Sequence, residues 1–274
     1  MAPLPPEGGV GEGHDKPATK GALFLVEDCR ILLRATGPAR GTRLFTHQHL
    51  LEHTLMLGLP PLLPTLLLLL SAGSASAQER NVNYQLLAAS RKESVPAVRE
   101  LLDRGAIADS RDRNGDTPLN LAARAGAVPL ATLLLQRGAT VDLANLAGVT
   151  PLMAASFSGH DAVLRLLLQR GADLRRVDRV SKTAMVYAAG NGHTECVRAL
   201  LDAGVDVNTR YRNDLTALMW AAAYGQAETV KLLLGRGADP NARDNRGKTA
   251  HMMAAEERHA DVAELLRAGG ASKP

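Results

Sequence analysis

Residues 114–139 read NGDTPLNLAARAGAVPLATLLLQRGA, and residues 147–172 repeat the pattern as AGVTPLMAASFSGHDAVLRLLLQRGA. Each stretch has a Thr-Pro-Leu start, an Ala-rich apolar segment, a short turn and a second apolar segment that ends in Gly-Ala. A period this long predicts stacked copies of one small unit rather than a single unrepeated core. The closing glycine recurs every 33 residues, at Gly105, Gly138, Gly171, Gly204, Gly237 and Gly270.

Each copy carries signals for two short helices. A proline after the threonine, as at Pro118 and Pro151, fits the first helical position. The periodic glycine suits a left-handed residue that ends the second helix. The chain is 46% hydrophobic but only 3% aromatic, which favours closely packed Leu/Ala/Val helices over a sandwich or barrel. The threonines that can cap the first helices are Thr117, Thr150, Thr183, Thr216 and Thr249.

The copies beginning at Asn114, Ala147, Val180, Asn213 and Arg246 resemble the ankyrin repeat, and residues 84–105 resemble a sixth, degenerate copy. The resemblance covers residues 80–274. It implies an all-α ankyrin solenoid of about six helix-turn-helix repeats with β-turn tips. One position departs from the family, whose T-P-L-H motif ends in a histidine that takes part in hydrogen bonds between neighbours. Because other residues replace it here, we expect the stack to rely more on apolar contact. The replacements are Asn120, Met153, Val186, Met219 and Met252.

The part before the repeats reads differently. Residues 56–77 have an apolar run followed by small residues and end in Ala-Ser-Ala before Gln78. This predicts a cleaved signal peptide; the alternative is a retained anchor, although the unbroken run of residues 66–70 is far shorter than the ~20 residues of a membrane span. Residues 1–55 are predicted to be an unstructured extension from a mis-assigned translation start. The repeats would occupy residues 78–274 of an exported, periplasmic protein, or of one anchored to the inner membrane.

Basic residues gather at the predicted tips between repeats. In ankyrin-like stacks these tips and the exposed face of the first helices line one concave surface. Arginine can grip carboxylates with two parallel hydrogen bonds, so an acidic protein surface is the expected complement. The alternative is a solubilising edge, partly neutralised by aspartates at positions 112, 178, 214 and 244. The tip arginines are Arg111, Arg113, Arg175, Arg176, Arg179, Arg210, Arg212, Arg243 and Arg246.

Three aromatic residues are candidate anchors beside these arginines. Phe157 and Tyr224 occupy variable first-helix positions where the family meets its ligands, and Tyr211 stands at a tip. Aromatic residues and Arg are common interface anchors. Partner contact and plain packing both remain open for Phe157 and Tyr224. Trp220 and Tyr187 are predicted to pack between repeats.

Other motifs that suggest chemistry fit the repeat pattern better. The P-loop-like residues 242–249 follow no hydrophobic strand, and Gly247 and Thr249 stand at repeat positions. The histidines form no metal-ligand cluster, and Cys196 falls at a core position of a second helix. A net charge of +4 is too mild to indicate nucleic acid. We therefore expect no enzyme activity, cofactor, metal, small-molecule substrate or nucleic-acid partner, and a monomer.

The functional expectation is a non-enzymatic protein–protein interaction module in the bacterial envelope, contacting the membrane only if the leader is uncleaved. Its similarity to exported bacterial ankyrin-repeat proteins implies, as one option, support of an envelope or antioxidant enzyme such as a catalase. The alternatives are an immunity or inhibitor protein against a secreted toxin or enzyme, and a membrane-tethered scaffold.

Overall fold

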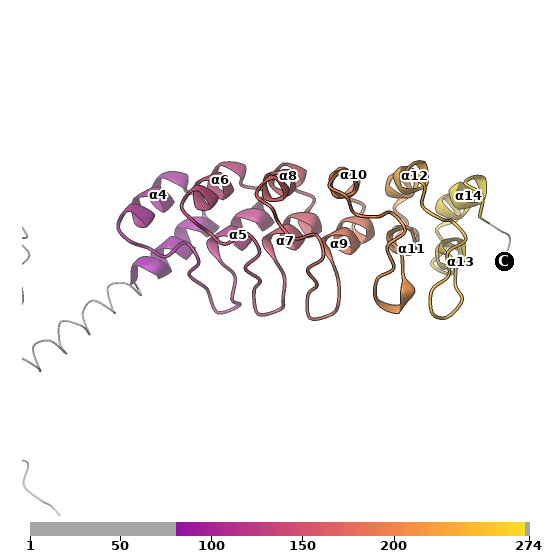
Figure 1. Cartoon of the computed structure of the whole chain (residues 1–274), viewed down its shortest axis with the longest axis horizontal. Helices are drawn as coiled ribbons and strands as arrows, with labels where there is room; N and C mark the ends of the chain where they lie inside the picture. The colour runs from indigo at the N-terminus through magenta and orange to yellow at the C-terminus, as the bar shows by residue number, and fades with distance from the viewer. Residues whose placement is uncertain (1–80, 272–274) are drawn as a thin grey trace, which may run out of the picture. The chain divides into compact units, whose positions relative to one another are not determined.

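The computed structural model describes residues 81–271. They form helix pairs that stand side by side, with the first helices in one row and the second helices in another (Figure 1). No strand occurs within these residues, and the predicted all-α solenoid is confirmed. The opening pair consists of residues 81–91 and α4 (Val95–Asp103). The later pairs are α5 (Pro118–Ala125) and α6 (Val128–Gln136), α7 (Pro151–Ser158) and α8 (Asp161–Gln169), α9 (Ala184–Gly190) and α10 (Thr194–Asp202), α11 (Ala217–Ala223) and α12 (Ala227–Gly235), and α13 (Ala250–Glu256) and α14 (Ala260–Ala268).

The predicted extension (1–55) and leader (56–77) lie outside the described residues. In the part of the chain that the structure describes, no helix has the length and apolar character that a membrane crossing requires.

The five predicted threonine caps are all confirmed. Each threonine oxygen accepts the backbone N–H of the residue three positions later, as Thr150 does from Met153 at 3.3 Å. Pro118 and Pro151 occupy the first helical turn that follows two of these caps. Local chemistry therefore fixes where each first helix begins.

The ends of the second helices are confirmed as well. Gly204, for example, has φ +100°, a left-handed conformation that costs glycine little. The other five periodic glycines also have positive φ. The chain can therefore leave each second helix in the same direction, toward the next copy.

Leucine and alanine fill the core between neighbouring helix pairs. Leu119, Leu152 and Leu218 of the first helices are almost fully buried. First helices pack on first helices and second on second, each mainly against the adjacent repeat. Cys196 is only 1% exposed, so its predicted core position is confirmed.

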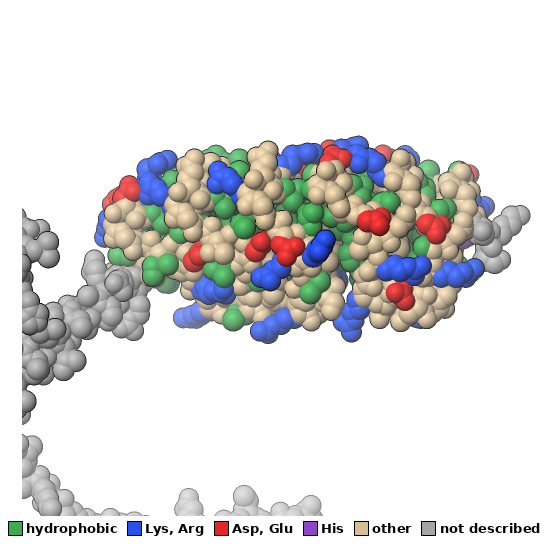
Figure 2. All heavy atoms as spheres, viewed as in Figure 1, with side chains coloured by type: hydrophobic (Ala, Val, Ile, Leu, Met, Phe, Trp, Pro, Cys, Tyr) green, Lys and Arg blue, Asp and Glu red, His purple; other side chains and the backbone are tan. Residues whose placement is uncertain are grey.

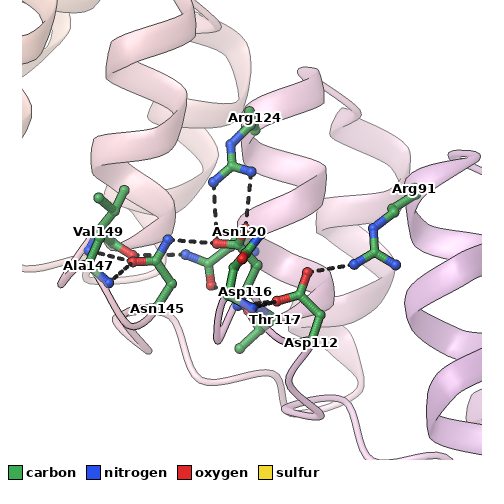
Figure 3. Close-up of polar contacts among 10 residues, drawn as sticks. Arg91, Asp112, Asp116, Thr117, Asn120, Arg124, Asn145, Ala147 and Val149 are labelled. Atoms are coloured by element: carbon green, nitrogen blue, oxygen red, sulfur yellow. Dashed lines mark hydrogen bonds and ion pairs between the residues drawn. The ribbon is translucent and has the colours of Figure 1, made fainter. Parts of the chain in front are cut away.

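The expectation of mainly apolar contact at the T-P-L-H position is wrong for the first clear repeat. There Asn120 is fully buried, and its Nδ2 donates to the Val149 carbonyl of the next copy at 3.0 Å (Figure 3). Its Oδ1 accepts the Thr117 hydroxyl at 2.6 Å. Asparagine thus supplies a polar link to the next repeat, because its amide carries both donors and acceptors.

Candidate functional site

Five hairpin loops extend beyond the row of first helices (Figure 1). In each, the N–H of the first residue donates to the carbonyl of the fifth, as Tyr211 does to Leu215 at 2.9 Å. We number them in chain order as hairpin 1 (residues 112–116), hairpin 2 (145–149), hairpin 3 (178–182), hairpin 4 (211–215) and hairpin 5 (244–248).

An Asp or Asn side chain at the first position organises hairpins 1, 2, 3 and 5. In hairpin 3, one carboxylate oxygen of Asp178 accepts the N–H groups of Val180 at 2.9 Å and Lys182 at 2.8 Å. Such local bonds are a common reason for Asp and Asn in turns. Hairpin 4 has Tyr211 instead, and its centre is the 3₁₀ turn η1 (Arg212–Asp214), in which two non-glycine residues have positive φ. Hairpin 4 is therefore built differently from the other four.

Hairpins 1 and 2 are joined by a dense polar network (Figure 3). The buried Asp116 carboxylate pairs with both Arg124 guanidinium nitrogens at 3.1 and 3.3 Å and accepts Asn145 Nδ2 at 2.7 Å. Arg91 pairs with Asp112 at 2.5 Å. The carboxylates of this region are already occupied by groups of the protein itself.

The nine candidate arginines are all exposed, and Figure 2 shows basic side chains spaced along the hairpin edge. Three of them stand at the same repeat position and brace the hairpins. Arg111 Nη1 donates to the Ala144 carbonyl at 2.9 Å, and Arg210 Nη1 donates to the Arg243 carbonyl at 3.0 Å. Arg243 donates to Gly247 within its own hairpin at 2.7 Å. These guanidinium groups support the loops and keep only part of their donor capacity for a partner.

Arg246 is engaged by an acid of its own hairpin. Its guanidinium lies 2.9 Å from the buried Asp244 carboxylate. Burial alone would raise the pKa of Asp244, but the N–H groups of Lys248 and Arg246 and the Arg246 charge hold it below its ordinary value. This aspartate therefore stays ionised at neutral pH and neutralises Arg246.

The remaining arginines are the most available. Within residues 81–271, the guanidinium groups of Arg113, Arg179, Arg212 and Arg175 have no hydrogen bond or ion pair. The first three share one repeat position at the tips of hairpins 1, 3 and 4, whereas Arg175 stands in the turn after α8. Arg176, in the same turn, makes one long contact of 3.5 Å to the Asp142 carbonyl. Most of the guanidinium groups without a partner among these candidates therefore lie at or near hairpins 3 and 4.

Two of the three aromatic candidates, Phe157 and Tyr224, belong to a continuous row on the first-helix face. Phe157 and Tyr224 are each 55% exposed. The Phe157 ring meets the Tyr187 ring edge-on at 5.6 Å, and Tyr224 stacks on Trp220 at 6.0 Å. Lys182 Nζ lies 5.4 Å from the Tyr187 ring centroid and 5.0 Å from that of Trp220. We call five residues the aromatic row: Phe157, Tyr187, Lys182, Trp220 and Tyr224. Phe157 and Tyr224, at its two ends, each pack against a neighbouring ring and also keep part of their surface exposed.

Tyr187 and Trp220 are only half buried, so they contribute to the surface as well as to packing between repeats. The Tyr187 hydroxyl donates to the Asp178 carboxylate. Burial first, and then this hydrogen bond, raise the pKa of the Tyr187 phenol well above its ordinary value. The sequence reasoning missed Lys182. The available signal was its place as the last residue of hairpin 3, directly before the helix that carries Tyr187.

Tyr211, the third aromatic candidate, is the first residue of hairpin 4 and is only partly exposed. Its ring packs partly buried against the core beside hairpin 3. Burial raises the pKa of Tyr211 to about 12, although the hydroxyls of Thr183 and Thr209 act in the opposite direction. Tyr211 takes the place that a turn-forming Asp or Asn has in the other four hairpins.

A 620 Å³ open pocket adjoins the end of the aromatic row at Trp220 and Tyr224 and reaches Arg246 and Glu256. In the described stretch, no group of three or more His, Cys, Asp or Glu side chains could hold a metal ion. The site thus offers aromatic faces and guanidinium donors, which are groups suited to recognising another protein.

Comparison with known proteins agrees with this architecture. A family model described as ankyrin repeats in three copies matches overlapping segments, residues 63–145, 86–178, 138–211, 176–244 and 210–273. A comparison with curated proteins returned no significant match. Because the matches together span most of the sequence, the chain belongs to the ankyrin-repeat family.

Proposed function

We propose that this chain is a non-enzymatic interaction module of the bacterial envelope that binds an acidic partner protein through its hairpins and aromatic row. Ankyrin repeats are generally protein–protein interaction modules and are typically non-enzymatic. The finer statement, an acidic partner and this face, rests on the side chains of this chain.

The observation that carries the proposal is the neighbourhood of free arginines and exposed aromatic rings. The guanidinium groups of Arg179 and Arg212 have no partner in the described residues. Arg179 shares hairpin 3 with Lys182 of the aromatic row, and Arg212 stands on the next hairpin. Aromatic residues bury large areas at little entropic cost, and arginine adds bidentate bonds to carboxylates. An acidic protein surface would complement both.

The test is affinity capture with the full chain from the envelope fraction of its native host, followed by direct binding to the protein recovered. The triple variant Arg113→Glu, Arg179→Glu, Arg212→Glu should lose the partner, as should Phe157→Ala, Tyr224→Ala. The matched control reverses three exposed arginines near the second helices, Arg99, Arg170 and Arg267, and should retain it. A partner bound equally by all variants would contradict the proposal.

The proposed location has its own test. We propose that residues 56–77 are removed on export, so the mature protein isolated from its host should begin at Gln78. N-terminal sequencing and intact mass measure this directly. A protein that retains residues 56–77 and sediments with the membrane would instead support the tethered scaffold. A mature start upstream of Met56 would contradict the assignment of residues 1–55.

A further inference from the structure

Neighbouring hairpins are joined by a backbone hydrogen bond at every junction but one. The N–H of Leu146 donates to Asn114 at 3.0 Å, that of Arg179 to Ala147 at 3.0 Å, and that of Asn245 to Asn213 at 3.1 Å. The equivalent pair between hairpins 3 and 4 is the Arg212 N–H and the Val180 carbonyl. No such bond joins them, and within residues 81–271 neither group has a hydrogen bond.

A second link fails at the same junction. Elsewhere an Asp or Asn in the turn after a second helix accepts a backbone N–H of the next turn. Asp142 accepts from Asp173 at 3.1 Å, and Asn208 accepts from Asp239 at 2.8 Å. The equivalent residue here is Arg175, whose guanidinium has donors only and cannot accept the Asp206 N–H. Two independent changes in sequence thus leave one junction without its usual ties.

The helices at this junction remain joined. Gln226 Nε2 donates to the Gly190 carbonyl at 3.1 Å, and the hydroxyls of Thr194 and Thr229 lie 2.9 Å apart. On the aromatic row, Lys182 bridges the junction through its contacts with two rings. The opening is therefore confined to the hairpin side, between two fixed helix pairs.

The space between hairpins 3 and 4 holds two open pockets of about 260 and 950 Å³. Both are lined by Ser181, Tyr211 and Arg212, so they adjoin each other across the hairpins. We call this combined space the slot. One end reaches Lys182 and Trp220 of the aromatic row; the other reaches the turn that contains Arg175.

The lining of the slot is basic and aliphatic. The guanidinium groups of Arg175 and Arg212 have no partner in the described residues, and Arg210 and Lys182 add two further cations. Asp206 is the acidic residue of the lining. Val177 and Val180 are 55% and 53% exposed at its walls and offer aliphatic surface. A complementary ligand would alternate carboxylates with aliphatic side chains.

We propose that the slot binds an extended acidic peptide segment of the partner protein, which takes the place of the missing contacts between hairpins 3 and 4. A peptide carbonyl would accept the Arg212 N–H, and a peptide N–H would donate to the Val180 carbonyl, as in recognition by strand addition. Carboxylates of the segment would meet Arg175 and Arg212, and an aliphatic side chain would lie against the valines. This inference deepens the proposed function and rests on it.

The experiment begins with selection from a random library of linear dodecapeptides displayed on phage, with the full chain as bait. Enriched peptides should be rich in Asp and Glu with intervening aliphatic residues. Synthetic copies should bind in fluorescence anisotropy, and hydrogen exchange measured by NMR should show the Arg212 amide becoming protected. Failure to enrich acidic peptides, or peptides that leave Arg212 unprotected, would overturn the proposal.

Matched charge reversals distinguish peptide binding in the slot from general attraction to the arginines along all the hairpins. Arg212→Glu and Arg175→Glu should each weaken peptide binding about tenfold or more. Arg113→Glu reverses the charge at the same repeat position on hairpin 1, outside the slot. It should leave binding of the isolated peptide within about twofold, because only the whole partner would extend to hairpin 1. Equal losses from Arg113→Glu and Arg212→Glu would show general attraction to the basic edge and would contradict the slot.

A closing variant supplies the two missing ties while the guanidinium group of Arg212 is kept. Arg175→Asn together with Tyr211→Asp introduces the residue types found at the equivalent positions of tied junctions. The slot should close and peptide binding should fall at least tenfold, with helix content unchanged by circular dichroism. Partner capture that survives this variant but fails after Phe157→Ala, Tyr224→Ala would retain the proposed function and reject the slot. Undiminished peptide binding by the closing variant would also reject the slot.

Discussion

At the scale of single residues, one polar side chain in the core stands at a position that is apolar in the other clear repeats. Position 251 is a core position filled by leucine or methionine in the other clear repeats, at Leu119, Leu152, Met185 and Leu218. Here it is His251, only 7% exposed, and neither ring nitrogen has a hydrogen-bond partner within residues 81–271. An unpaired buried polar group costs about 1–3 kcal/mol.

His251→Leu should therefore stabilise the protein by about 1–2 kcal/mol, because it removes the unpaired nitrogens and restores an aliphatic side chain. Urea unfolding followed by circular dichroism measures the change. The contrasting control is His193→Leu, which removes the 2.9 Å bond between Nε2 and the Phe157 carbonyl and should destabilise. A lower urea midpoint for His251→Leu would contradict this account.

Cys196 should be an unreactive thiol. Burial, with a smaller contribution from Asp161, raises its pKa to about 12, so almost no thiolate exists at pH 8. The chain has one other cysteine, Cys29, which is replaced by serine for this test. Ellman's reagent should then label the native protein at least about 100-fold more slowly than the denatured chain. Because the folded pKa lies above the unfolded one, the stabilising contribution is present below pH 9 and declines as pH rises toward 12. Rapid labelling of the native protein would place this thiol at the surface.

At the scale of helices and hairpins, short polar contacts decide where each element begins. α7 is only 8 residues long, and its start rests on the Thr150 oxygen that accepts the Met153 N–H. An isolated helix of this length is not stable in water, so its caps and its neighbours must hold it.

Thr150→Ala should lower the free energy of unfolding by about 1 kcal/mol, because the cap is buried and nothing replaces its oxygen. Thr150→Ser keeps the hydroxyl and should retain most of the stability. Chemical denaturation of both variants checks this, and equal losses in the two would mean that the methyl group, rather than the cap, is the important part.

The hairpins show which structural features at this scale could be predicted from the sequence alone. Asp112, Asn145, Asp178 and Asp244 are recognisable as turn formers, and Tyr211 as the exception. Their own loops could be predicted, since an Asp or Asn turn is built from adjacent residues. The missing bond between hairpins 3 and 4 could not, because it joins groups that come together only when two repeats stack.

At the scale of the whole described stack, each repeat contacts mainly its neighbours, so stability depends on the interfaces between them. The junction between hairpins 3 and 4 lacks two of the ties that the others have. Local opening should therefore start there.

Hydrogen exchange should be faster for amides of hairpin 4 than for those of hairpins 2 and 5, because hairpin 4 lacks both the Asx turn and the bond to hairpin 3. Arg175→Asn with Tyr211→Asp should reduce this difference and raise the midpoint of urea unfolding. NMR or mass spectrometry measures the exchange. Uniform exchange across the three hairpins in the unmodified protein would rule out a weak junction.

The sequence by itself determined the fold, because its signals are local and repeated: a threonine cap, a proline in the first turn, an alanine pair, and a glycine at the end of every second helix. It also identified nine arginines and three aromatic residues without showing which were free. Only the tertiary structure showed that the Arg111 guanidinium braces a hairpin whereas that of Arg212 has no partner in the described residues. It also showed that Tyr211 is partly buried and that Lys182 belongs to the aromatic row. The physical reason is that availability depends on acceptors and rings from the neighbouring repeat, about 33 residues away in the chain, which are brought within bonding distance only by stacking.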